Sequence, residues 1–205
     1  IAGGNGVKMA WFLVSTRGGK PTAVEASNWL SALGAGLEQD LLEGETDIQP
    51  FEGELTGDEV WTKLISPQDE IDLKNYFYQK YSSYQSDVVS YAFTYVHSPV
   101  DQSGFLWVGA DDGIKAWLNG ELVLDNPATG SFKLVEDQVP VDIREGYNSL
   151  LVKVRNESGS YAFSLGVMDE GGSTLPGVQY MTEAPATAVS EAADVEALPR
   201  GLALE

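Results

Sequence analysis

Two adjacent aspartates in the middle of the chain have the residue type and the spacing of an ion-binding turn. Asp111 and Asp112 precede a glycine within GFLWVGADDGIKAWLNGELVLDN, residues 104–126. Calcium takes six to eight hard oxygen ligands at about 2.3–2.6 Å, and adjacent carboxylates with loop carbonyls supply such ligands. Asp125 and Asn126 follow one hairpin later. The sequence therefore predicts a calcium set of Asp111, Asp112 and Asp125, with Asn126 as a further ligand contact.

The same aspartates also suit a purely structural turn. A carboxylate at the end of a strand accepts backbone N–H groups of the turn that follows. Asp-Gly and the later Asn119-Gly120 are both hairpin signals. We favour this structural interpretation and keep calcium as the cofactor that the alternative would require.

A second candidate is the aromatic stretch NYFYQKYSSYQ, residues 75–85. Exposed rings bind sugars because their apolar faces pack against the CH faces of pyranoses. In a loop-like stretch, Tyr76, Tyr78, Tyr81 and Tyr84 could form such a ligand-binding platform. The alternative, which we favour for most of them, is that these rings cap one end of the fold. Trp107 and Trp117 lie in predicted strands, and we expect at least one of them to point inward as core.

Catalytic motifs are scarce. The chain has one histidine and no cysteine, which excludes a cysteine nucleophile and any site built on several histidines. With 31 acidic residues, close carboxylate pairs must occur by chance and say nothing about glycosidase chemistry. No nucleophile elbow, P-loop or dinucleotide motif is present. The sequence therefore predicts a protein that is not an enzyme.

Composition narrows the choice of partners. The 205 residues carry 31 acidic and 12 basic side chains, a net charge of −19. Such a surface repels nucleic acid and anionic membranes. No apolar run approaches the ~20 residues that a membrane-spanning helix needs. We therefore expect neither nucleic acid binding nor membrane insertion.

The elements that must position these residues are mostly strands. Residues 23–42 have apolar side chains at helical spacing and predict a short helical insert near the N-terminus, although Gly34 and Gly36 weaken it. After Met181 the composition becomes rich in Ala, Glu and Pro, so 1–181 is predicted as one domain and 182–205 as a tail that docks on this domain or on another chain. Pro140 marks its strand as an edge or bent strand. Short apolar or alternating runs predict strands at 7–15, 60–65, 88–97, 105–110, 114–118, 121–124, 133–143, 149–155 and 161–168.

Short strands at close spacing favour a mainly β sandwich or barrel. The run from Val89 to Met168 resembles the galactose-binding-like jelly-roll domains attached to secreted bacterial glycoside hydrolases and polysaccharide lyases. The likeness rests on YAFTYVHSP, GADDGIKAWLNGELV, EDQVPVDIREGYNSLLVKV and SYAFSLGVMDEGG. It implies a jelly-roll β-sandwich. The Asp-Asp-Gly turn also resembles that of protective-antigen-type lectin domains, in which such a pair holds calcium and the ion holds sugar hydroxyls.

Two functions of different classes follow from these observations. The first is a non-catalytic carbohydrate-binding accessory module of a secreted or cell-surface protein, with a polysaccharide or glycan as its partner. The second is a structural subunit or adhesion module of an extracellular assembly, which contacts neighbouring protein subunits or domains through the tail. Aromatic rings in a concave groove would favour the first function.

Overall fold

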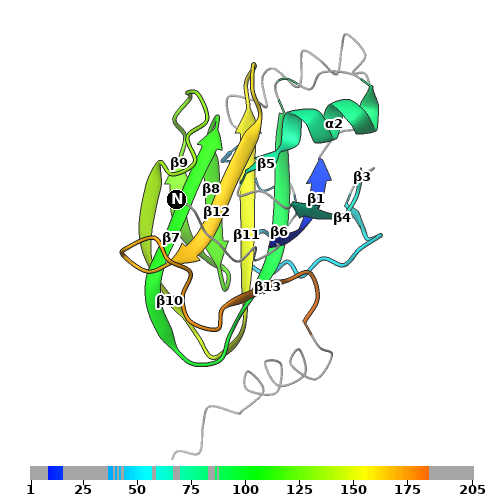
Figure 1. Cartoon of the computed structure of the whole chain (residues 1–205). Coiled ribbons are helices and arrows are strands. Elements are labelled where there is room, and N and C mark those ends of the chain that lie inside the picture. The colour runs from blue at the N-terminus through cyan, green and yellow to red at the C-terminus, as the bar shows by residue number, and fades with distance from the viewer. Residues whose placement is uncertain are drawn as a thin grey trace, which may run out of the picture.

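Two antiparallel β-sheets form the body of the molecule. The computed structural model describes residues 9–15, 37–38, 40, 42, 44–56, 59–66, 70–82, 86 and 88–184. The larger sheet has the order β4-β1-β6-β11-β8-β9, and the smaller has the order β10-β7-β12-β5. In Figure 1, β7 and β12 of the smaller sheet lie in front of β11 of the larger one. The predicted class, a mainly β sandwich, is confirmed.

The strand bounds agree closely with the sequence periodicity. The larger sheet consists of β1 (Met9–Ser15), β4 (Thr62–Ser66), β6 (Val88–Ser98), β8 (Ile114–Leu118), β9 (Glu121–Asn126), β11 (Gly146–Asn156) and β13 (Gln179–Met181). The smaller sheet consists of β5 (Ile71–Asp72), β7 (Gln102–Asp111), β10 (Asp137–Ile143) and β12 (Ala162–Met168). A separate hairpin joins β2 (Leu55–Thr56) to β3 (Glu59–Val60).

From β6 onward the chain repeatedly crosses between the sheets, as in a jelly roll. β6, β8, β9, β11 and β13 belong to the larger sheet, and β7, β10 and β12 to the smaller. β1 and β13 share one side of β6, with β1 along 90–93 and β13 along 95–97. The last strand therefore completes the sheet beside the first, and the predicted domain extends at least to Met181.

The main core lies between the sheets. Alternation directs Leu106 and Val108 of β7 and Phe163 of β12 toward Ala116 of β8 and Val152 of β11, and all five side chains are buried. Burial of this apolar surface is the main favourable contribution to folding. A second core covers the other face of the larger sheet and consists of Trp61, Tyr91, Phe93, Tyr95, Trp117 and Leu151.

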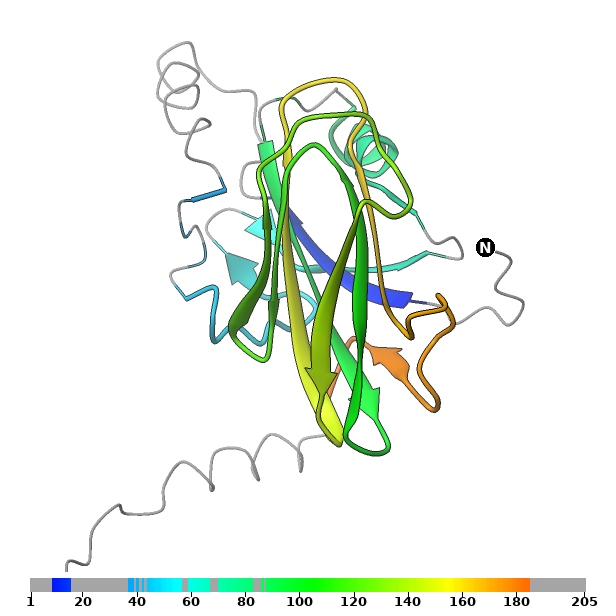
Figure 2. The ribbon, with the colours of Figure 1, turned by 90° about the vertical axis from the view of Figure 1, so that its left-hand side faces the viewer.

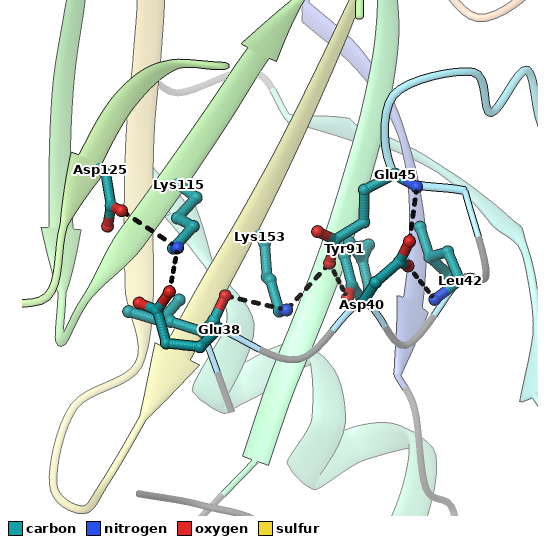
Figure 3. A network of polar contacts seen from close by, with 9 residues as sticks. Glu38, Asp40, Leu42, Glu45, Tyr91, Lys115, Asp125 and Lys153 are labelled. Atoms are coloured by element: carbon teal, nitrogen blue, oxygen red, sulfur yellow. Dashed lines mark hydrogen bonds and ion pairs between the residues drawn. The ribbon is translucent and has the colours of Figure 1, made fainter. Parts of the chain in front are cut away.

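The second core is closed by a segment that we call the cover segment, the described residues between 37 and 54. Leu42 and Ile48 of this segment pack against the second core. Two lysines on the same face of the larger sheet bind the cover segment through charge (Figure 3). Lys115 Nζ lies 3.0 Å from Glu38 Oε2, and Lys153 Nζ lies 2.9 Å from Glu45 Oε1.

One end of the sandwich carries the helix α2 (Leu73–Tyr81), and β13 lies toward the opposite end in both Figure 1 and Figure 2. No helix among the described residues is long and apolar enough to cross a bilayer. The predicted helical insert and the predicted tail fall outside the described residues, apart from a few at their borders.

Candidate functional site

The aspartate pair lies at the α2 end of the sandwich, where β7 turns into β8. Asp111 is only 4% exposed, and its Oδ2 accepts a hydrogen bond from the Phe132 backbone N–H at 3.0 Å. Asp112 Oδ2 accepts from Glu157 N–H at 2.7 Å, and its Oδ1 accepts from Gly130 N–H at 3.3 Å. The two carboxylates thus hold the loop between β9 and β10 and the turn after β11 against the β7–β8 turn.

Electrostatics at the pair follow from burial. Desolvation raises the pKa of Asp111 above its ordinary value, and the negative charge of Asp112 adds to this effect. The hydrogen bond from Phe132 favours the ionised form and opposes the rise. Because the N–H groups that the two carboxylates accept lie after β9 and after β11, the pair holds neighbouring loops and not only its own turn.

The other two residues predicted beside the pair have different partners. Asp125 Oδ2 lies 3.0 Å from Lys115 Nζ, so the cation that it faces is an ammonium group (Figure 3). Asn126 Nδ2 donates to Asp137 Oδ2 at 2.6 Å, which links β9 to β10. The structure therefore brings Asp111 and Asp112 together but engages Asp125 elsewhere.

The fit of a calcium ion can be judged from these donors. Three of the four carboxylate oxygens of the pair already accept backbone N–H groups. Over the described part of the chain, no three Asp, Glu, His or Cys side chains gather closely enough to hold an ion. An ion at the pair would have to share those oxygens and take further ligands from backbone carbonyls. Calcium binding by the pair stays a prediction.

Residues 75–81 of the aromatic stretch belong to the helix α2, so the prediction of a loop-like segment is wrong for these residues. Asp72 caps the N-terminus of α2 by accepting from Asn75 N–H at 2.8 Å, and Ser82 ends the helix with a φ of 54°. Successive rings on a helix point in directions about 100° apart. Tyr76 and Tyr78 are two positions apart and therefore do not share one face of the helix.

Burial sorts the rings of α2. Phe77 is 1% exposed and stacks against Tyr161, with ring centroids 6.0 Å apart. Tyr76 is partly buried against the main core, whereas Tyr78 is 58% exposed. The helix thus caps one end of the sandwich. The side chain of Tyr81 and the whole of Tyr84 lie outside the described residues.

The prediction that at least one of the two strand tryptophans points inward as core is confirmed for Trp117. Trp117 alternates with Ala116 and Leu118 and packs in the second core under the cover segment. Trp107 alternates with Leu106 and Val108 and lies on the outer face of the smaller sheet, where it is partly exposed. Gly172 passes close to its ring, since a Cβ there would lie 2.5 Å from the indole. Trp107 therefore stands under the loop that follows β12.

Sequence reasoning missed an open groove that runs beside the free edges of β9 and β10. Its volume is about 760 Å³, within the usual size of ligand sites. It lies toward the end opposite the aspartate pair, because it reaches the first residues of β7 and β9 and the last residues of β10. Its lining comprises Ser103, Gly104, Phe105, Leu118, Asn119, Glu121, Val123, Pro140, Val141, Asp142, Arg144, Asp169 and Glu170. We call this feature the edge groove.

The edge groove combines an apolar floor with a polar rim. Phe105 is partly exposed, Val123 is half-buried, and Pro140 is exposed on the edge strand. At the rim, Asp142 Oδ1 accepts from Ser103 Oγ at 2.6 Å, so one of its oxygens is fixed in place. The only local signal for the groove was Pro140, which marks β10 as an edge strand, a prediction that is confirmed.

Comparisons with known proteins add little. No family model matches the chain, and no curated protein is similar to it. Among solved structures the chain is similar to one titled "Crystal structure of PA14 domain of MpAFP Antifreeze protein", with 23% identity and a TM-score of 0.39. The match covers 48% of this chain and about half, 55%, of that structure. A likeness of this extent carries no argument about ligand or activity.

Proposed function

We propose that the chain is a non-catalytic glycan-binding accessory module of a secreted or cell-surface protein, and that it binds glycan in the edge groove. The observation that carries this proposal is the groove itself, with the Phe105 ring among exposed acceptors and donors. A pyranose offers an apolar CH face and a belt of hydroxyls. The ring suits the face, and the exposed carboxylates and Arg144 suit the hydroxyls.

The exposure of the groove supports binding rather than catalysis. Its acidic side chains, Glu121, Asp142, Asp169 and Glu170, are all exposed. A site that excludes water gains most from electrostatic stabilisation of a transition state, and this groove is open. An open groove along a sheet edge suits a polymer that rests in it without being cleaved.

The alternative function, a subunit of an extracellular assembly, would need a surface that pairs with another chain. The edge of β10 is poorly suited to strand addition, because Pro140 lacks an N–H and the strand also carries the acidic residues Asp137 and Asp142. Contacts through the tail involve residues outside the described ones. A glycan therefore suits the described surface better than an added strand.

The proposal is tested by screening the chain against a glycan panel, with calcium and then with a chelator. Phe105→Ala should abolish binding, whereas Tyr78→Ala, which removes the exposed ring of α2, should leave it unchanged. Circular dichroism of both variants serves as the control for folding. Loss of binding only in Tyr78→Ala would move the site to α2, and no binding to any glycan would favour the assembly function.

The role of calcium is tested separately by calorimetry. If the pair holds an ion, Asp111→Asn/Asp112→Asn should remove the heat of calcium binding. The chelator should weaken glycan binding by the parent chain only if the ion contacts sugar or orders the groove. Unchanged heat in the double variant would exclude the pair as ligands.

A further inference from the structure

The edge groove carries an unbalanced charge. Glu121, Asp142, Asp169 and Glu170 line it, and Arg144 is its single basic residue. The walls therefore hold four carboxylates against one guanidinium, a net of three negative charges. In the described chain no hydrogen bond or ion pair engages the side chains of Glu121 and Glu170, and both are exposed. These two carboxylates are ready to accept hydrogen bonds from a ligand.

The four acids come from three separate parts of the fold and stand around the same space. Glu121 begins β9 in the larger sheet, Asp142 lies in β10 of the smaller sheet, and Asp169 and Glu170 follow β12. Asp169 Oδ1 is held by Ser173 N–H at 2.8 Å, so the loop after β12 has a fixed shape. A ligand in the edge groove would thus meet carboxylates from three separate parts of the fold.

We infer that the ligand of the edge groove is a glycan with protonated amino groups, that is, a polymer of amino sugars without anionic substituents. This inference rests on the proposed function. The groove, with its apolar floor, is what identifies the site, and the charge of its walls selects the class of ligand. An ammonium group gains charge-assisted hydrogen bonds from the free carboxylates, while a uronate or sulfate would meet repulsion.

The expected selectivity is moderate because these carboxylates are exposed. Exposed ion pairs are individually weak, so two or three of them together should favour the amine-bearing glycan by about tenfold over its N-acetylated form. The Debye length is about 10 Å at 0.1 M salt and shortens as the salt concentration rises. Raising the salt concentration should therefore reduce the preference for the amine-bearing glycan, while apolar contacts with Phe105 persist.

The test compares three short oligosaccharides of equal length by calorimetry: β-linked 2-amino-2-deoxyglucose, its N-acetylated form, and a uronic acid oligomer. The groove variant is Glu121→Gln/Asp142→Asn/Glu170→Gln. Its matched control is Asp47→Asn/Glu52→Gln/Glu183→Gln, which removes three exposed carboxylates outside the groove and leaves the same net charge. The control separates binding in the groove from general attraction of a cationic oligomer to a chain of charge −19.

We expect the parent chain and the control to prefer the amine-bearing oligomer about tenfold, and the groove variant to lose the preference. Equal loss in both variants would show general charge attraction and overturn the inference. Equal binding of the amine-bearing and N-acetylated oligomers, or tighter binding of the uronic acid oligomer, would overturn the inference and leave the proposed function standing. No binding of any of the three oligosaccharides would overturn the inference, whereas the proposed function fails only if no glycan of the wider panel binds.

Discussion

The ion pair between Lys153 and Glu45 offers the sharpest test of how the larger sheet is covered. The Lys153 side chain is 0% exposed, and its Nζ contacts Glu45 Oε1 at 2.9 Å and the Leu37 carbonyl at 3.2 Å. It also lies 5.3 Å from the centroid of the Tyr91 ring, and Tyr91 donates its hydroxyl to Glu45. Glu45 is 11% exposed and is the carboxylate partner of this buried ammonium.

We predict that Glu45→Gln lowers the free energy of unfolding by about 3 kcal/mol, the lower end of the range for breaking a buried pair. The lower end applies because Glu45 keeps slight access to water, and because a glutamine oxygen can still accept from Tyr91. Lys153→Met should cost less, since the carboxylate that it leaves keeps slight access to water, whereas the ammonium left by Glu45→Gln is fully buried. The double variant should be more stable than Glu45→Gln alone, because no uncompensated charge remains.

The pH dependence gives a second, independent readout. Burial holds the pKa of Lys153 below its ordinary value of 10.5, and Glu45 opposes that shift. Removing Glu45 lowers the pKa of Lys153 further. Between this lowered pKa and 10.5, Lys153 carries a proton in the unfolded chain but not in the folded chain, and the removal of Glu45 widens this pH range. Stability then rises with pH between the lowered pKa and 10.5, by at most about 1.4 kcal/mol per pH unit.

The assay is urea unfolding of the parent and the variants between pH 6 and 9.5, a window set by the ionisation of unfolded tyrosines near pH 10. Desolvation raises the pKa of the partly buried Tyr180 to about 12, so stability falls again above pH 10 as the phenol of the unfolded chain ionises first. A cost below about 1 kcal/mol for Glu45→Gln, the range of exposed pairs, would refute the argument that this pair is desolvated. A pH slope that persists in the double variant would assign the slope to another group.

Substitutions at three further positions test other contacts, each by the free energy of unfolding in urea. The buried amide of Asn148 accepts from Arg144 N–H and donates to the Val96 and Arg144 carbonyls. Asn148→Ala should cost about 2–4 kcal/mol, because it removes all three hydrogen bonds. Asn148→Asp should cost less at low pH than at neutral pH if those contacts are the cause, since a carboxyl group donates a hydrogen bond only when it is protonated. Phe77→Ala should cost about 3–5 kcal/mol by opening a cavity beside Tyr161, and Phe77→Leu clearly less. Gly109→Ala should destabilise by more than 1 kcal/mol, since its Cβ would lie 1.8 Å from a backbone oxygen, and a neutral result would contradict the described course of the loop.

Local patterns predicted the strands because alternation and turn chemistry act over a few residues. The strand Ile114–Leu118 was predicted with its observed bounds. The Asn119-Gly120 turn has φ values of 52° and 78°, which those residue types tolerate, and a Cβ at Gly120 would lie 2.3 Å from the Thr46 carbonyl oxygen. The turn itself needs no knowledge of the distant chain, whereas the close approach of Thr46 is a tertiary contact that local patterns do not reveal.

The helix α2 was missed for a physical reason. Its residues include three tyrosines and a phenylalanine, which favour strands. Among the side chains that the structure describes in this helix, Leu73 and Phe77 show the i, i+4 spacing of a buried helical face. The cap at Asp72 and the packing of Phe77 on Tyr161 then outweigh that preference. Tertiary contacts of this kind cannot be deduced from composition.

The predicted strand at 133–143 was too long by four residues. β10 begins at Asp137, because the preceding loop crosses the outer face of β7, where the Lys133 carbonyl closely approaches Gly109. The edge groove escaped prediction for a related reason. Its lining comes from β7, β8, β9, β10 and the loops after β10 and β12, and only the sheet order places these segments around one space.

The asymmetry of the two outer faces connects the fold to the proposed site. The outer face of the larger sheet carries Tyr91, Phe93 and Trp117, and the cover segment closes it with Glu38 and Glu45 bound to two lysines. Sequence alternation predicts which residues point away from the main core, but it does not tell whether another segment covers them. On the smaller sheet, Phe105 keeps part of its surface exposed beside the edge strand β10. Aromatic rings on the larger sheet therefore stabilise the fold, whereas Phe105 on the smaller sheet remains available to a ligand.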